Sequence, residues 1–143
     1  LLEGDLLISI TADLGIIGVV PASFGDAFIS QHIALVRLNK EVINPEFAGY
    51  FLSSQVGQIM FSLLNDGGAK AGLNLKTINK IAVIKPPLEE QNLIVLRIEK
   101  SNQFVRELDK RRAKLRSLKT GLMQDLLSGK VRVGQLLKEA VAA

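Results

Sequence analysis

The residues able to do chemistry are few and scattered along this chain. His32 is the only histidine and cysteine is absent, so a cluster of imidazole and thiolate metal ligands cannot form. Glu89 and Glu90 are neighbours on a predicted helix, where their carboxylates point in different directions and cannot act as a catalytic pair. No serine lies in a Gly-x-Ser-x-Gly turn, and no Gly-x-Gly-x-x-Gly cofactor turn occurs. The sequence therefore favours a binding module without a cofactor over an enzyme.

A glycine-rich basic segment, residues 67–76, is the most suggestive binding element. Its glycines let the backbone approach a partner closely, and Lys70, Asn74 and Lys76 offer donors to phosphates and base edges. It lacks the Gly-Lys-Ser/Thr ending of a phosphate-binding loop. A plain surface loop is the alternative interpretation.

The net charge of +4 is unevenly distributed. Residues 1–88 carry six basic and seven acidic side chains, whereas residues 89–143 carry twelve basic and seven acidic ones. Most of this basic excess lies in one stretch: Arg106, Lys110, Arg111, Arg112, Lys114, Arg116 and Lys119. Such a run is typical of a solvated helix face, and equally of a surface that attracts nucleic acid or an acidic partner.

The elements that position these residues belong to an α+β fold. Short apolar runs at residues 6–10, 16–20, 28–29, 33–38 and 81–85 predict strands of a small mixed sheet, the first two forming a hairpin. Asn44 and Pro45 predict the start of a helix that runs to about Leu64, weakened by Gly57. Residues 77–80 are expected to form a brief helical turn.

A long helix is predicted from Leu88 to Gly129. Pro86 and Pro87 stop the preceding element, and no proline or glycine interrupts the chain from Leu88 to Thr120. Such a helix is roughly 60 Å long, at 1.5 Å for each residue. We therefore divide the chain into a globular part (1–87), the helix (88–129) and a tail (130–143).

Apolar residues recur along this helix in steps of four and three, which is the pattern of a coiled coil. We call this row the seam; its apolar members are Ile94, Ile98, Val105, Leu108, Leu115, Leu122 and Leu126, and it is interrupted by Ser101, Arg112 and Lys119. One helix cannot bury such a row alone. We expect a second helix to cover it, from another chain or by self-association; a helix folded back on its own domain is the alternative.

Two segments resemble a known family. Residues 84–91, Ile-Lys-Pro-Pro-Leu-Glu-Glu-Gln, resemble the junction in specificity (S) subunits of type I restriction-modification enzymes, where a target-recognition domain leads into a helical spacer. Residues 122–133 resemble the end of that spacer, and residues 4–9, 17–18 and 31–33 fit the recognition domain. The chain looks like the C-terminal portion of one recognition domain with its spacer.

This resemblance implies a DNA-binding, non-catalytic function. The recognition domain would read half of a bipartite site in double-stranded DNA, and the spacer would set the half-site distance and dock methyltransferase (M) subunits, with restriction (R) subunits joining the complex. The candidate DNA contacts are Thr11, Gln31, His32, Lys70, Asn74 and Lys76. A coiled-coil assembly module with no appreciable DNA binding of its own is the alternative function.

Composition limits the cellular setting. No apolar run approaches the length of a membrane span, and the sequence shows no secretory signal. A reducing, cytoplasmic compartment fits the absence of cysteine. The first residues, Leu-Leu-Glu, suggest a fragment of a longer protein.

Overall fold

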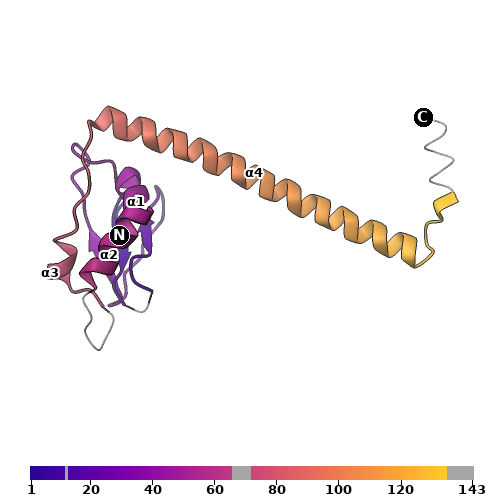
Figure 1. Ribbon diagram of the computed structural model, residues 1–143, viewed down its shortest axis with the longest axis horizontal. Helices are drawn as coiled ribbons and strands as arrows, with labels where there is room; N and C mark the ends of the chain where they lie inside the picture. The colour runs from indigo at the N-terminus through magenta and orange to yellow at the C-terminus, as the bar shows by residue number, and fades with distance from the viewer. Residues whose placement is uncertain (12, 66–71, 135–143) are drawn as a thin grey trace. The chain divides into compact units, whose positions relative to one another are not determined.

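The computed structural model describes residues 1–11, 13–65 and 72–134 of the chain. They fall into two compact units, the first spanning Leu1–Ile98 and the second starting at Glu99. The first unit holds a sheet, three helices and the first turns of a fourth helix (Figure 1). The fold is α+β, as predicted.

The sheet has three strands in the order β2-β1-β3, with β1 (Leu6–Ser9) between β2 (Ile17–Val19) and β3 (Ile33–Val36). Leu7 stands opposite Gly18 on one side and Leu35 on the other. Every pairing among the described strands is antiparallel, so the mixed sheet expected from the sequence is not found there. A parallel pair needs a long crossover connection, whereas β1 and β2 are joined by a hairpin.

Two predicted strands are not strands. Residues 28–29 and 81–85 have no strand assignment, although Ile81 and Val83 still pack against the core. Apolar residues alternate in residues 81–85 because every second side chain packs against the core. The segment does not pair with an edge of the sheet.

The helix predicted up to Leu64 is broken into α1 (Pro45–Ser53) and α2 (Gln55–Leu64). Ser54 is extended at the break, and its hydroxyl accepts a hydrogen bond from the Gly57 N–H at 3.4 Å. A Cβ at Gly57 would overlap the backbone of Leu52. Gly57 therefore permits the close turn between the helices, which is a stronger requirement than its weak helix propensity. At the start of α1, Asn44 is the N-cap, as predicted.

The core of the first unit lies between the sheet and the helices. Its buried apolar members are Leu6, Ile8, Ala34, Leu52, Phe61, Leu73 and Ile78. Leu73 precedes the short helix α3 (Leu75–Ile78) and Ile78 is its last residue, so the segment after residue 71 is anchored by its own apolar side chains. At the interface of α1 with β2, a Cβ on Gly49 would come within 2.7 Å of the Val19 side chain.

The longest element, α4, spans Leu88–Leu127 and has 40 residues. At 1.5 Å for each residue it is about 60 Å long. It ends two residues before the predicted end, because Gly129 takes a left-handed conformation (φ 73°) in the turn that follows. No helix among the described residues has an apolar stretch long enough to cross a membrane.

Candidate nucleic-acid interface

Two of the predicted DNA-contacting side chains touch each other at one end of the sheet. The Thr11 Oγ1 and His32 Nδ1 atoms are 2.9 Å apart, and the Ile10 N–H donates to the His32 carbonyl at 3.0 Å. The first contact fixes the orientation of an exposed imidazole. It engages Nδ1, so Nε2 is the ring nitrogen left to meet a partner.

Gln31 lies beside this pair. The Ile33 N–H donates to the Ser30 carbonyl at 3.2 Å, which closes a turn with Gln31 and His32 at its two central positions. Both side chains are exposed. The turn before β3 therefore carries two exposed polar side chains at its central positions.

The chain that leads into α3 runs along the same end of β1. Thr11 forms an antiparallel bridge with Gly72, and the Leu73 N–H donates to the Ile10 carbonyl at 3.0 Å. Asn74, two residues after Gly72, is the N-cap of α3: its Oδ1 accepts a hydrogen bond from the Thr77 N–H at 2.9 Å. Its capping role leaves the amide NH₂ as the group that can donate to DNA.

Of the two lysines predicted to bind phosphate, Lys76 is exposed on α3. Lys70 lies outside the described residues. The structure thus brings Thr11, Gln31 and His32 together, with Asn74 and Lys76 in the segment that follows the Gly72 bridge.

An ion pair that the sequence did not predict lies at the opposite end of β1. The Arg37 guanidinium donates from Nε to Asp5 Oδ1 and from Nη2 to Oδ2, both at 2.7 Å. The Leu2 N–H adds a third hydrogen bond to this carboxylate at 2.7 Å. Asp5 is only 1% exposed, whereas the Arg37 side chain is 57% exposed.

These contacts stabilise the ionised form of the carboxylate. The hydrogen bonds from Arg37 lower the pKa of Asp5 from its ordinary value of 3.8 to about 2, against the opposing effect of burial. Because Asp5 neutralises the arginine, we assign Arg37 a structural role that joins the ends of β1 and β3.

Gln91, the last residue of the Pro-Pro-Leu-Glu-Glu-Gln segment, is a second buried polar residue. Its side chain is 0% exposed. Its Oε1 accepts from the Asn44 N–H at 2.8 Å, and its Nε2 donates to the carbonyls of Val42 (3.2 Å) and Pro86 (2.8 Å). All three partners are backbone groups, so Gln91 fastens the first turn of α4 to the entry of α1.

Beyond these first turns the seam of α4 is largely uncovered. Val105, Leu108, Leu115 and Leu122 are 47–58% exposed, while Ile94, Ile98 and Leu126 are partly buried. Exposed apolar side chains in a contiguous row mark an interaction surface. The prediction that a second helix covers the seam stays a prediction.

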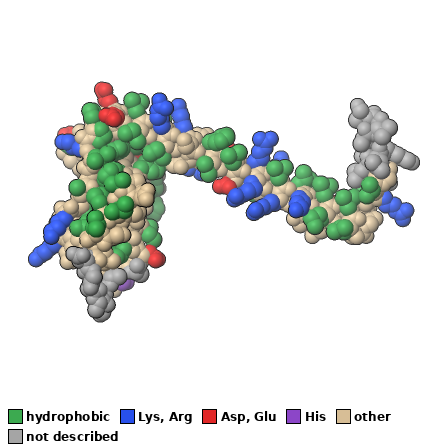
Figure 2. Space-filling view, in the orientation of Figure 1, with side chains coloured by type: hydrophobic (Ala, Val, Ile, Leu, Met, Phe, Trp, Pro, Cys, Tyr) green, Lys and Arg blue, Asp and Glu red, His purple; other side chains and the backbone are tan. Residues whose placement is uncertain are grey.

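Basic side chains gather along the middle of α4 on the face seen in Figure 2. Two of them form ion pairs: Arg106 with Glu99 at 3.8 Å and Arg112 with Asp109 at 2.8 Å. Exposed pairs of this kind contribute little to stability. Among the described residues, no group of three or more histidine or acidic side chains could hold a metal ion.

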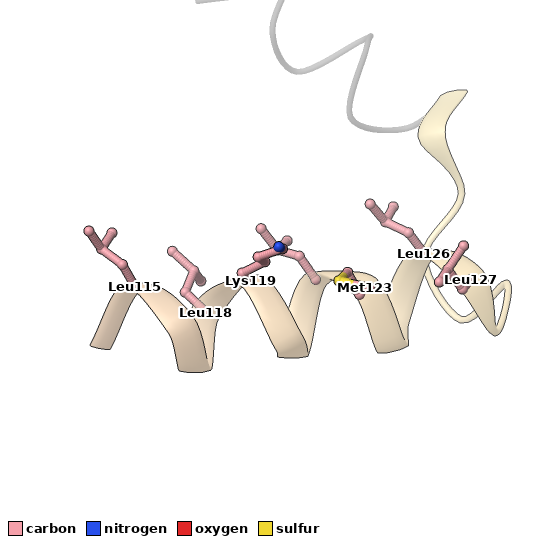
Figure 3. A pocket seen from close by; sticks show the side chains of 7 residues that line it. Leu115, Leu118, Lys119, Met123, Leu126 and Leu127 are labelled. Carbon is pink, nitrogen blue, oxygen red and sulfur yellow. The ribbon is translucent and has the colours of Figure 1, made fainter. Parts of the chain in front are cut away.

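The described residues thus combine a small α+β unit that has a polar, hydrogen-bonding edge with a long helix whose apolar row is exposed (Figure 3). The chain belongs to the type I restriction modification DNA specificity domain family, whose model matches residues 1–115.

Individual relatives agree with this assignment. The putative type I restriction enzyme MjaX specificity subunit of Methanocaldococcus jannaschii is 30% identical over 131 residues, which cover 92% of this chain and 30% of that protein. The type I restriction enzyme EcoBI specificity subunit of Escherichia coli is 30% identical over 108 residues, covering 76% of this chain and 23% of that protein. The chain thus spans less than a third of the length of either relative. No solved structure matches it significantly.

Proposed function

We propose that this chain is a DNA sequence-specificity component of a type I restriction-modification complex. In this proposal the first unit reads half of a bipartite site in double-stranded DNA. The family and the specificity subunits that resemble the chain support this proposal.

The observation that carries the proposal is the grouping of Thr11, Gln31 and His32 at one end of the sheet. The 2.9 Å contact between Thr11 and His32 holds a ring whose Nε2 can address a base edge. A glutamine can make two hydrogen bonds to adenine in the major groove. Asn74 adds an amide donor, and Lys70 and Lys76 supply phosphate contacts, which position the protein without reading sequence.

In the same proposal α4 is a spacer and a docking element. Half-site separation is a geometric quantity, and an uninterrupted helix of 40 residues holds a fixed length. The exposed seam and the surrounding basic residues offer a surface to methyltransferase subunits, and restriction subunits join through the complex. Methylation and cleavage belong to these partners, and the chain itself is non-catalytic.

The salt dependence of DNA binding tests the lysine assignments. We expect the double variant Lys70→Ala, Lys76→Ala to reduce the slope of log affinity against log salt by roughly 2, since each phosphate contact contributes about 0.9. The matched control is Lys40→Ala with Lys85→Ala, which removes two other exposed lysines. Equal slopes in the two double variants would remove Lys70 and Lys76 from the interface.

A second candidate function is supported by the exposed seam alone: a coiled-coil assembly module with no appreciable DNA binding of its own. A gel shift at low salt with the wild-type chain separates the two. Retarded DNA supports the specificity function, whereas the absence of any shift, with the protein folded, favours the assembly module.

A further inference from the structure

Phe28 is the most exposed large apolar side chain among the residues that the structure describes. It is 97% exposed, whereas Phe47 and Phe61 of the same unit are only 4% and 3% exposed. The Phe28 ring therefore contributes nothing to the core. A partner that covered it would gain affinity by removing its apolar surface from water.

The main chain that carries Phe28 is held on both sides of the ring. The carbonyl of Ala27, just before Phe28, accepts a hydrogen bond from the Leu1 nitrogen at 3.0 Å. Two residues after Phe28, the Ser30 carbonyl accepts a hydrogen bond from the Ile33 N–H at 3.2 Å. The ring thus projects from a backbone with a defined path.

Phe28 also lies close to the candidate nucleic-acid interface, three residues before Gln31. Three residues span at most about 11 Å even when fully extended, which is about the rise of three base pairs along one DNA strand. A duplex that reaches Gln31 therefore brings its neighbouring bases within range of the Phe28 ring. Asp26 is the only acidic side chain among residues 21–32, so this loop carries little charge that would repel phosphates.

An apolar ring beside a glutamine matches the groups that an A·T base pair shows in the major groove. Adenine presents N7 and N6, which a glutamine side chain can bind with two hydrogen bonds. Thymine presents O4 and a C5-methyl group, and this methyl is the one apolar group in the major-groove pattern. Phenylalanine is among the side chains that contact it.

We propose that Phe28 is a specificity-determining residue that contacts the C5-methyl group of a thymine in the major groove, near the base pair read by Gln31. This inference rests on the proposed DNA-reading function and adds to it a base that the first unit selects. The half-site then contains a thymine within about three base pairs of the adenine bound by Gln31. Phe28 supplies an apolar requirement that the hydrogen bonds of Gln31 and His32 do not express.

An apolar contact differs from a phosphate contact in its response to salt. It displaces no counterions, so its removal lowers the affinity for DNA without changing the slope of log affinity against log salt. We expect Phe28→Ala to bind DNA about tenfold more weakly, or worse, at every salt concentration. The lysine double variant, by contrast, should change the slope.

Phe24→Ala is the matched control, because it removes the same ring from the same loop. Phe24 is 56% exposed and lies seven residues before Gln31, with Gly25 in a left-handed conformation (φ 82°) directly after it. We expect Phe24→Ala to keep the wild-type affinity for DNA. Both variants change exposed side chains, so both should keep the wild-type urea midpoint.

Removal of the thymine methyl group is the decisive test. The probe is the duplex that the full wild-type chain enriches from a pool with randomised base pairs, and each of its thymidines is replaced in turn by deoxyuridine. We expect one replacement to weaken wild-type binding by about fourfold, which is the effect of one buried methylene-sized group. The same replacement should weaken Phe24→Ala by the same factor and leave Phe28→Ala unaffected.

The possible failures separate this inference from the proposed function. Wild-type binding that is insensitive to every replacement, an enriched duplex without thymine, or a Phe28→Ala variant that responds as the wild type does would overturn the role of Phe28 alone. Wild-type affinity in Phe28→Ala would also overturn it and would assign the ring to a protein partner. A folded wild-type chain that binds no duplex would overturn the DNA-reading function, and this inference with it.

Discussion

The first unit and the distal part of α4 bury their apolar side chains to very different extents. Leu6, Ile8 and Leu52 are at most 2% exposed, whereas Leu108, Leu115 and Leu122 are 47–58% exposed. Polar groups follow the same division: Asp5 and Gln91 are buried with hydrogen-bond partners, while the ion pairs of α4 are at the surface. The first unit is therefore stabilised by its own contacts, whereas the apolar row of α4 is left exposed along the distal part of the helix.

Truncation of one leucine in each region should show this contrast most strongly. Leu52→Ala removes a fully buried side chain and should lower the free energy of unfolding by about 2–5 kcal/mol. Leu115→Ala should change it by less than about 0.5 kcal/mol in dilute, monomeric protein, as for surface substitutions. Urea denaturation at low and high protein concentration measures both. A comparable loss for Leu115→Ala at low concentration would mean that α4 is buried within its own chain.

The hydrogen bonds of Gln91 give a smaller expected effect. Gln91→Ala leaves the Asn44 N–H and the Val42 and Pro86 carbonyls without this partner, which should cost about 1–3 kcal/mol.

The neighbouring Glu90→Ala is the control for Gln91, because Glu90 is exposed on the same helical turn. Hydrogen exchange at Asn44 should accelerate in the Gln91 variant alone. Unchanged exchange at Asn44 would contradict the role of Gln91 as the tie between α1 and α4.

The Asp5–Arg37 pair should differ from the other two by a distinct pH dependence. The pKa of Asp5 is lowered to about 2 in the folded protein by Arg37, so its contribution is complete above the ordinary value of 3.8. It is lost as the pH falls through about 2.

We therefore expect Asp5→Asn to be less stable than wild type at pH 6, with a difference that shrinks between pH 4 and pH 2. Denaturation midpoints across this range measure it, and Asp13→Asn, at an exposed position, is the control. A difference that stays constant with pH would mean that the loss does not come from the carboxylate charge.

Elements whose signals are local were predictable from the sequence. The spacing of apolar residues identified β1 and α4, and Asn44 with Pro45 identified the start of α1. The helix break at Ser54 was missed because it depends on how closely Gly57 approaches Leu52. The strand predicted at residues 81–85 was wrong because alternation also describes an unpaired segment that packs on the core.

Within the candidate site, residue type identified His32 and Thr11 as donors, but only the fold shows that they touch. Arg37 bonds to Asp5 across 32 positions and Gln91 to Asn44 across 47. No local pattern reports such distant partners. The DNA-binding roles of all six candidate residues remain predictions: Thr11, Gln31, His32, Lys70, Asn74 and Lys76.

The partners of Gln91 suggest how the two parts of such a protein can be exchanged. Its three hydrogen bonds go to main-chain atoms of Asn44, Val42 and Pro86, so Gln91 recognises the path of the backbone, and the Asn44 amide that donates to Asn92 Oδ1 at 2.7 Å is the side-chain contact beside it. A first unit of unrelated sequence, but with the same main-chain path at Val42 and Asn44, could be joined to this helix. Where the proposed function holds, chimaeras joined immediately before Pro86 should acquire a new target preference while keeping the same helix α4.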